Sequence, residues 1–120
     1  MPFGGTDWLA LTPEETLEPN LPICDPHHHF WDYRTARIPF HRYLLHELAD
    51  DMNSGHNVRS TVFVEARSMY RIDGPDEMKP VGEVEFVQGL AAASATGLYG
   101  PGRAAAAIVG HADLNLGDEV

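Results

Sequence analysis

Apolar residues follow two different spacings along the chain, and each spacing predicts one kind of element. Three short runs are continuous or nearly continuous in apolar residues, which is typical of buried strands. Between them, apolar residues recur every three or four positions, which is typical of helices packed on one side. The predicted strands cover 21–28, 58–66 and 104–109, and the predicted helices cover 43–54 and 81–98.

Each predicted helix has one apolar face and ends near glycine. Gly55 follows the first helix in the position of a C-terminal cap, and Gly97 and Gly100 end the second. The apolar faces consist of Leu44, Leu45, Leu48, Ala49 and Met52 in the first helix, and of Val84, Val87, Leu90, Ala91, Ala95 and Leu98 in the second.

Strands that alternate with helices predict an α/β fold with a parallel sheet. Continuous apolar strands require cover on both sheet faces, but two helices cover only one. In a closed barrel the remaining strands cover the other face, so we expect 21–120 to be the N-terminal part of a (β/α)8 TIM barrel. Residues 1–20 are predicted to be an extended leader, with one turn after Thr12-Pro13, and residues 113–120 to begin a third helix.

The composition and charge limit the kinds of partner and compartment that we expect. The 120 residues are 43% hydrophobic and carry a net charge of −10, which argues against nucleic acid or an anionic membrane surface. No signal peptide or membrane span is recognisable, so the cytoplasm is the expected compartment. The single cysteine, Cys24, excludes an intramolecular disulfide and is predicted to be a buried core residue.

The densest chemical signal is the run Asp25-Pro26-His27-His28-His29 at the end of the first predicted strand. Residues two apart in a strand point to the same side, so Asp25, His27 and His29 are expected to share one face, with His28 on the other. Two imidazoles at this spacing can converge on one divalent ion, zinc or a similar metal. A bare His-x-His is more often a surface cluster, but the carboxyl end of a barrel strand is where such enzymes keep their active sites.

The residues around this run resemble the first-strand signature of the amidohydrolase-related family, in its lactone-hydrolase-like branch. The resemblance implies a metal-assisted hydrolase of a small lactone, amide or related carboxylated compound, with the metal at His27 and His29. The family's other ligands, a His from a middle strand and an Asp after the last strand, have no counterpart here, so the isolated chain is expected to be inactive. The matching segments are Ile23 to Asp32, Tyr43 to Ala66, Tyr70 to Pro75, Pro80 to Glu83 and Ile108 to Leu114.

Other residues at the predicted strand ends are candidates for binding substrate. If Val62 and Val64 face the helices, Glu65 points into the barrel mouth; otherwise it forms a salt bridge with Arg67 or Arg71. Arg71 is positioned to clamp a substrate carboxylate or to remain solvated.

Two residues after the third strand leave a similar choice. His111 and Asp113 either line the site or cap the following turn. Three other histidines, His41, His46 and His56, are not expected to be ligands.

Three functions remain open at this point. The first is the metal-assisted hydrolase. The second is a metal-independent lactonase, in which His27 and His29 orient the carbonyl. The third is a non-catalytic fragment that binds metal weakly or pairs with another chain. The expected partners are a small-molecule substrate and, for the isolated unit, a second copy in a homo-oligomer.

Overall fold

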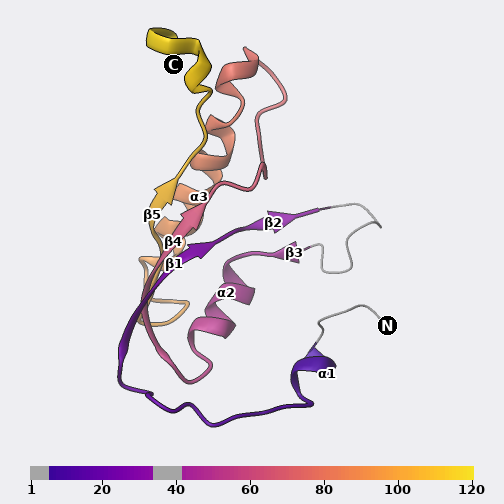
Figure 1. The fold of residues 1–120 in the computed structure, drawn as a ribbon. Coiled ribbons are helices and arrows are strands. Elements are labelled where there is room, and N and C mark those ends of the chain that lie inside the picture. Colours follow the sequence, from indigo (N-terminus) through magenta and orange to yellow (C-terminus); the bar gives the residue numbers. More distant parts are fainter. Residues whose placement is uncertain (1–5, 34–41) are drawn as a thin grey trace.

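A three-stranded parallel sheet forms the centre of the molecule in the computed structural model, which describes residues 6–33 and 42–120 (Figure 1). The strands lie in the order β1-β4-β5, so each strand pairs with the sheet strand that precedes it in the chain. The sheet and its helices are β1 (Pro22–His28), α2 (Leu45–Met52), β4 (Asn57–Val64), α3 (Val81–Ser94) and β5 (Arg103–Val109). The smaller elements are α1 (Thr6–Leu9), β2 (Trp31–Asp32), β3 (Arg42–Tyr43) and the 3-10 helices η1 (Asp76–Met78) and η2 (Leu114–Glu119).

The predicted order of strands and helices is confirmed, and both strand pairs are parallel. The main error in length concerns α3, which ends at Ser94 instead of continuing to Leu98. The chain turns at Gly97, which has a φ of 79°, a left-handed conformation that favours glycine. Leu98 is therefore 86% exposed and does not belong to the packed face of the helix.

Two predictions outside the sheet are wrong. The expected turn after Thr12-Pro13 is not helical, and the only helical turn in the described part of the leader is α1. A lone turn is unstable without tertiary packing, and Leu11 beside it is 74% exposed. No strand was predicted between residues 28 and 58, but β2 and β3 form an antiparallel pair there, and their two-residue strands are too short to leave a pattern in the sequence.

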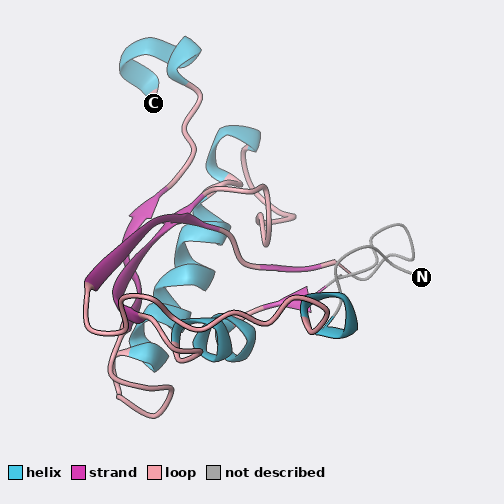
Figure 2. Cartoon of the chain, turned by 60° about the horizontal axis from the view of Figure 1, so that its bottom comes forward, coloured by secondary structure: helices cyan, strands magenta, loops and turns pink. Residues whose placement is uncertain are grey.

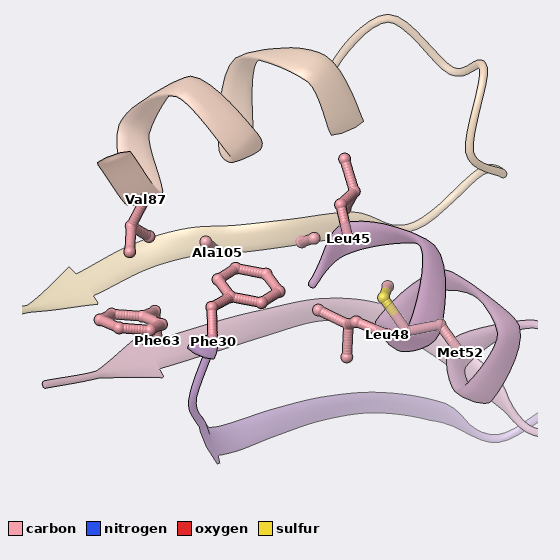
Figure 3. Packing of buried hydrophobic residues seen from close by; sticks show 8 residues of the cluster. Phe30, Leu45, Leu48, Met52, Phe63, Val87 and Ala105 are labelled. Atoms are coloured by element: carbon pink, nitrogen blue, oxygen red, sulfur yellow. The ribbon is translucent and has the colours of Figure 1, made fainter. Parts of the chain in front are cut away.

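Both long helices pack on the same face of the sheet (Figure 2). Phe30, just beyond β1, stacks on Phe63 of β4 with ring centroids 5.7 Å apart, and both rings are fully buried. Val87 of α3 closes over them, as Figure 3 shows. The buried apolar cluster consists of Phe30, Leu45, Leu48, Met52, Phe63, Val87, Ala104 and Ala105.

No helix of residues 6–33 and 42–120 lies over the opposite face of the sheet. Val62 and Val64 of β4 are only half-buried there, and Val109, the register partner of Val64, is 51% exposed. Cys24 pairs in register with Ser60 and is exposed, so the prediction of a buried cysteine is wrong. The strands are thus not buried on both faces as their apolar runs predicted, because both helices pack on one face only.

Thr61 stabilises the centre of the covered face. Its hydroxyl accepts the Ala105 backbone N–H at 2.8 Å and forms a hydrogen bond with His28 Nε2 at 2.8 Å. Ala105 has a φ of 50° and lies where β5 contains two more residues than β4 between matching register pairs, a β-bulge. Thr61 therefore supplies the partner that the ladder cannot give to this N–H.

None of the helices in the two described stretches is long and apolar enough to cross a bilayer.

Candidate functional site

His27 and His29 form a pair at the carboxyl end of β1. Their Nε2 atoms are 3.3 Å apart, and the two rings meet edge to face with centroids 4.9 Å apart. His29 Nδ1 lies 2.7 Å from the backbone oxygen of Val64, at the end of β4. A carbonyl can only accept, so Nδ1 carries the proton and Nε2 is left with its lone pair toward His27.

A bulge in β1 decides which residues share this side of the sheet. In the register between β1 and β4, Asp25 pairs with Thr61 and His28 pairs with Phe63, so β1 has one extra residue there. Asp25 therefore lies on the helix-covered side with His28, and the expectation that it shares a face with His27 and His29 is wrong. Its Oδ1 instead accepts the His27 N–H at 3.1 Å, which stabilises the bulge.

His28 lies on the covered side, as predicted. It is 8% exposed, and its ring packs edge-on against Phe30 and Phe63. Burial lowers the pKa of His28, because the charged imidazolium loses its hydration. This neutral, packed ring anchors the end of β1 from behind and leaves its two neighbours on the uncovered side.

The spacing of the pair matches one edge of a tetrahedral metal site. Two imidazole nitrogens that each lie about 2.0–2.1 Å from a tetrahedral ion are about 3.3–3.4 Å apart. The observed Nε2 to Nε2 distance of 3.3 Å matches this spacing. The hydrogen bond from His29 Nδ1 to the Val64 carbonyl is the usual orienting contact of a histidine that binds a metal. Within 6–33 and 42–120, however, no third His, Cys, Asp or Glu joins them in a cluster.

Two other described histidines, His46 and His56, do not extend the pair. His46 packs edge-on against Tyr99, with centroids 5.2 Å apart, and His56 lies exposed before β4. The prediction about His41 falls outside the described residues.

The loop after β4 is held by a buried carboxylate that the sequence analysis missed. Glu83, in the first turn of α3, is 1% exposed, and its Oε2 accepts the backbone N–H groups of Ala66 at 3.1 Å and Ser68 at 2.9 Å. Burial raises the pKa of Glu83, although the two N–H donors act in the opposite direction. Arg67 and Met69, on either side of Ser68, have positive φ angles of 58° and 59°. Such angles are unfavourable for residues other than glycine and persist only where the surroundings enforce them.

Gly82 allows this contact between loop and helix. A Cβ at this position would lie 2.7 Å from both the Arg71 nitrogen and the Met69 oxygen. Only glycine permits the backbones to approach so closely. A glycine directly before an acidic residue in the first turn of a predicted helix was the available signal for Glu83.

Glu65 is part of the same loop, and neither alternative for it holds as stated. Thr61 and Phe63, not the valines, face the helices, so the condition for pointing Glu65 into a barrel mouth is not met. Its Oε1 accepts the Tyr70 hydroxyl at 2.5 Å and the Arg67 backbone N–H at 3.1 Å, and it forms no salt bridge with an arginine side chain among the described residues. Burial, and then the hydrogen bond to Glu65, raise the pKa of Tyr70.

The remaining candidate substrate-binding residues have different contacts in the structure. Arg71 is paired with Glu85 at the surface. Asp113 caps η2, because its Oδ1 accepts the Asn115 backbone N–H at 3.0 Å. His111 lines a pocket of about 460 Å³ together with Arg67 and Tyr70. The arginine that lines this pocket is Arg67, and Arg71 does not line it.

The fold and site together define a parallel α/β unit with a histidine pair at the carboxyl end of its first strand. Comparison of the chain with protein-family models, with curated proteins and with solved structures found no match.

Proposed function

We propose that this chain is the N-terminal part of an amidohydrolase-type barrel hydrolase, in which His27 and His29 supply two ligands of a divalent metal ion. Its substrate would be a small lactone, amide or related carboxylated compound. The observation that carries the proposal is the Nε2 to Nε2 distance of 3.3 Å on the uncovered side of the sheet.

The winding of the chain supports a barrel. Strand order follows chain order, and both helices pack on one face. A doubly wound sheet places helices on both faces and reverses direction at a switch point, whereas a barrel keeps all its helices outside. The uncovered face, with Val62, Val64 and Val109, would then be the barrel interior.

The residues of this chain have defined parts in such a site. A bound divalent ion polarises a carbonyl and makes its bound water more acidic. The Val64 carbonyl fixes the orientation of the His29 ring. The bulge in β1, which the Asp25 carboxylate stabilises, places His27 on the same side as His29. Because the described residues offer two ligands, the complete set requires groups from elsewhere, and we expect no hydrolysis by this chain alone.

Zinc titration of the purified chain by calorimetry tests the pair. We expect weak binding that disappears in the double variant His27→Ala with His29→Ala. The matched control, His46→Ala with His56→Ala, removes two histidines that lie away from the pair and should bind like the parent. Equal zinc binding by both double variants would sink the proposal.

The same distance also supports a metal-independent mechanism, because 3.3 Å accommodates an N–H···N hydrogen bond between the two rings. In that alternative, the pair holds a proton and orients the substrate carbonyl. Zinc would then bind the parent and both double variants equally poorly, while exchange-protected imidazole protons at His27 and His29 would appear in NMR spectra.

A further inference from the structure

The pocket beside the loop after β4 is distinct from the histidine pair. Its volume is about 460 Å³, within the range of small-molecule sites. It lies between segments that follow the carboxyl ends of β4 and β5, and neither His27 nor His29 lines it. Its lining residues are Arg67, Tyr70, Asp76, Glu77, Pro80, His111, Asp113 and Leu116.

One side of the pocket presents an unpaired cation on a fixed backbone. The Arg67 side chain has no ion pair with any acidic residue in 6–33 or 42–120. Its backbone is held in a left-handed conformation between two N–H groups that Glu83 binds. Glu65 fixes the neighbouring Tyr70 ring by accepting a hydrogen bond from its hydroxyl group. The exposed Arg67 guanidinium, on this fixed backbone, is therefore available to a carboxylate, which it can bind through two parallel hydrogen bonds.

The lining also contains three carboxylates, and they restrict which other groups a bound ligand can have besides the carboxylate that binds Arg67. Asp76 is already paired with Lys79, and Asp113 is already occupied by Asn115. Glu77 has no such partner among the described residues. Carboxylate oxygens repel a second anion but accept hydrogen bonds from a hydroxyl group.

We propose that this pocket binds a small monocarboxylate that carries a hydroxyl group away from its carboxylate. The carboxylate lies against Arg67, and the hydroxyl group donates to an acidic residue of the lining. The Tyr70 ring and Leu116 supply apolar contact between the two ends. The inference stands apart from the proposed hydrolysis, because it requires neither the metal nor the histidine pair.

Three matched probes test it on the full chain without metal: 4-hydroxybenzoate, its neutral amide 4-hydroxybenzamide, and the dicarboxylate terephthalate. Binding is followed by NMR titration of the Tyr70, His111 and Arg67 signals. We expect saturable binding of 4-hydroxybenzoate that is about tenfold tighter than that of either other probe, as a charge-assisted hydrogen bond provides. No saturation at these signals, or equal affinity for all three probes, would overturn the inference.

Arginine variants assign the preference to one side chain. Arg67→Gln should bind the benzoate and the amide equally, whereas Arg67→Lys should retain part of the preference. Arg71→Gln is the matched control, because Arg71 lies on the same loop but pairs with Glu85 outside the pocket. A full preference in Arg67→Gln would contradict the proposal. The double variant His27→Ala with His29→Ala should bind like the parent, so the result is independent of the zinc experiment.

Discussion

The two faces of the sheet differ in how tightly the protein fixes their side chains. On the covered face, Phe63 and Thr61 are fully buried, and the Thr61 hydroxyl bonds both the Ala105 backbone N–H and His28 Nε2. On the uncovered face, Val62 and Val64 are half-buried, and His27 is exposed. The covered face therefore holds most of the packed core, whereas the uncovered face carries the histidine pair and is packed more loosely.

The largest expected effect is on the free energy of unfolding, when one apolar side chain on each face is shortened to alanine. Phe63→Ala should lower the free energy of unfolding by about 3–5 kcal/mol, because it removes a fully buried ring from a packed stack. Val62→Ala, one residue away on the uncovered face, should cost only about 1 kcal/mol. Urea unfolding followed by circular dichroism measures both. Similar losses would show that the uncovered face is packed in solution.

A smaller effect should follow from removing the Thr61 hydroxyl. Thr61→Val keeps the shape but leaves the Ala105 N–H and His28 Nε2 without their partner, which should cost about 1–3 kcal/mol. Thr61→Ser keeps the hydroxyl, so the NMR signals of the His28 ring should move in the valine variant and stay in place in the serine variant. Unchanged His28 signals in Thr61→Val would contradict this arrangement.

A smaller change in the free energy of unfolding is expected from the buried Glu83 carboxyl group, and this change depends on pH. Because burial raises the pKa of Glu83 above 4.5, its contribution to stability is fully present below pH 4.5 and is lost as the pH rises through the folded-state value. Glu83→Gln does not titrate. The stability of the parent minus that of the variant should therefore fall with rising pH in a series of unfolding curves. A difference that grows with pH would be inconsistent with the buried carboxylate.

The smallest effect is expected at the uncovered edge. Val109→Thr keeps a β-branched side chain and adds a hydroxyl at a position that is 51% exposed. The free energy of unfolding should change by less than about 0.5 kcal/mol. A loss above 1 kcal/mol that increases with protein concentration would instead indicate that this face is covered by a second copy.

Element order was predictable because it depends on local spacing. The apolar runs and helical stripes of this chain occupy the positions where the sheet strands, α2 and α3 are found. The exposure of Cys24 was not predictable from its apolar neighbours, because burial depends on which sheet face the helices cover. Short elements such as β2 and β3 depend on their partner and leave no periodic signal.

The candidate site was predictable only in part. The alternation of β1 correctly placed His27 and His29 together and His28 apart. The side of the sheet on which Asp25 lies was predicted wrongly, because the extra residue of the bulge interrupts the alternation of side chains along β1. That Arg67 lines a pocket was not predicted, because its position depends on the contact between Glu83 and the loop, which joins residues distant in the sequence.

The sequential order of the strands has a consequence for synthesis of the chain. Ile23 pairs with Val58, about 35 residues later. At about 5–20 residues per second, β1 therefore waits roughly 2–7 s on the ribosome for its neighbour. From then on, each nascent strand finds a completed neighbour to dock against, and the open edge advances by one strand at a time toward the carboxyl terminus.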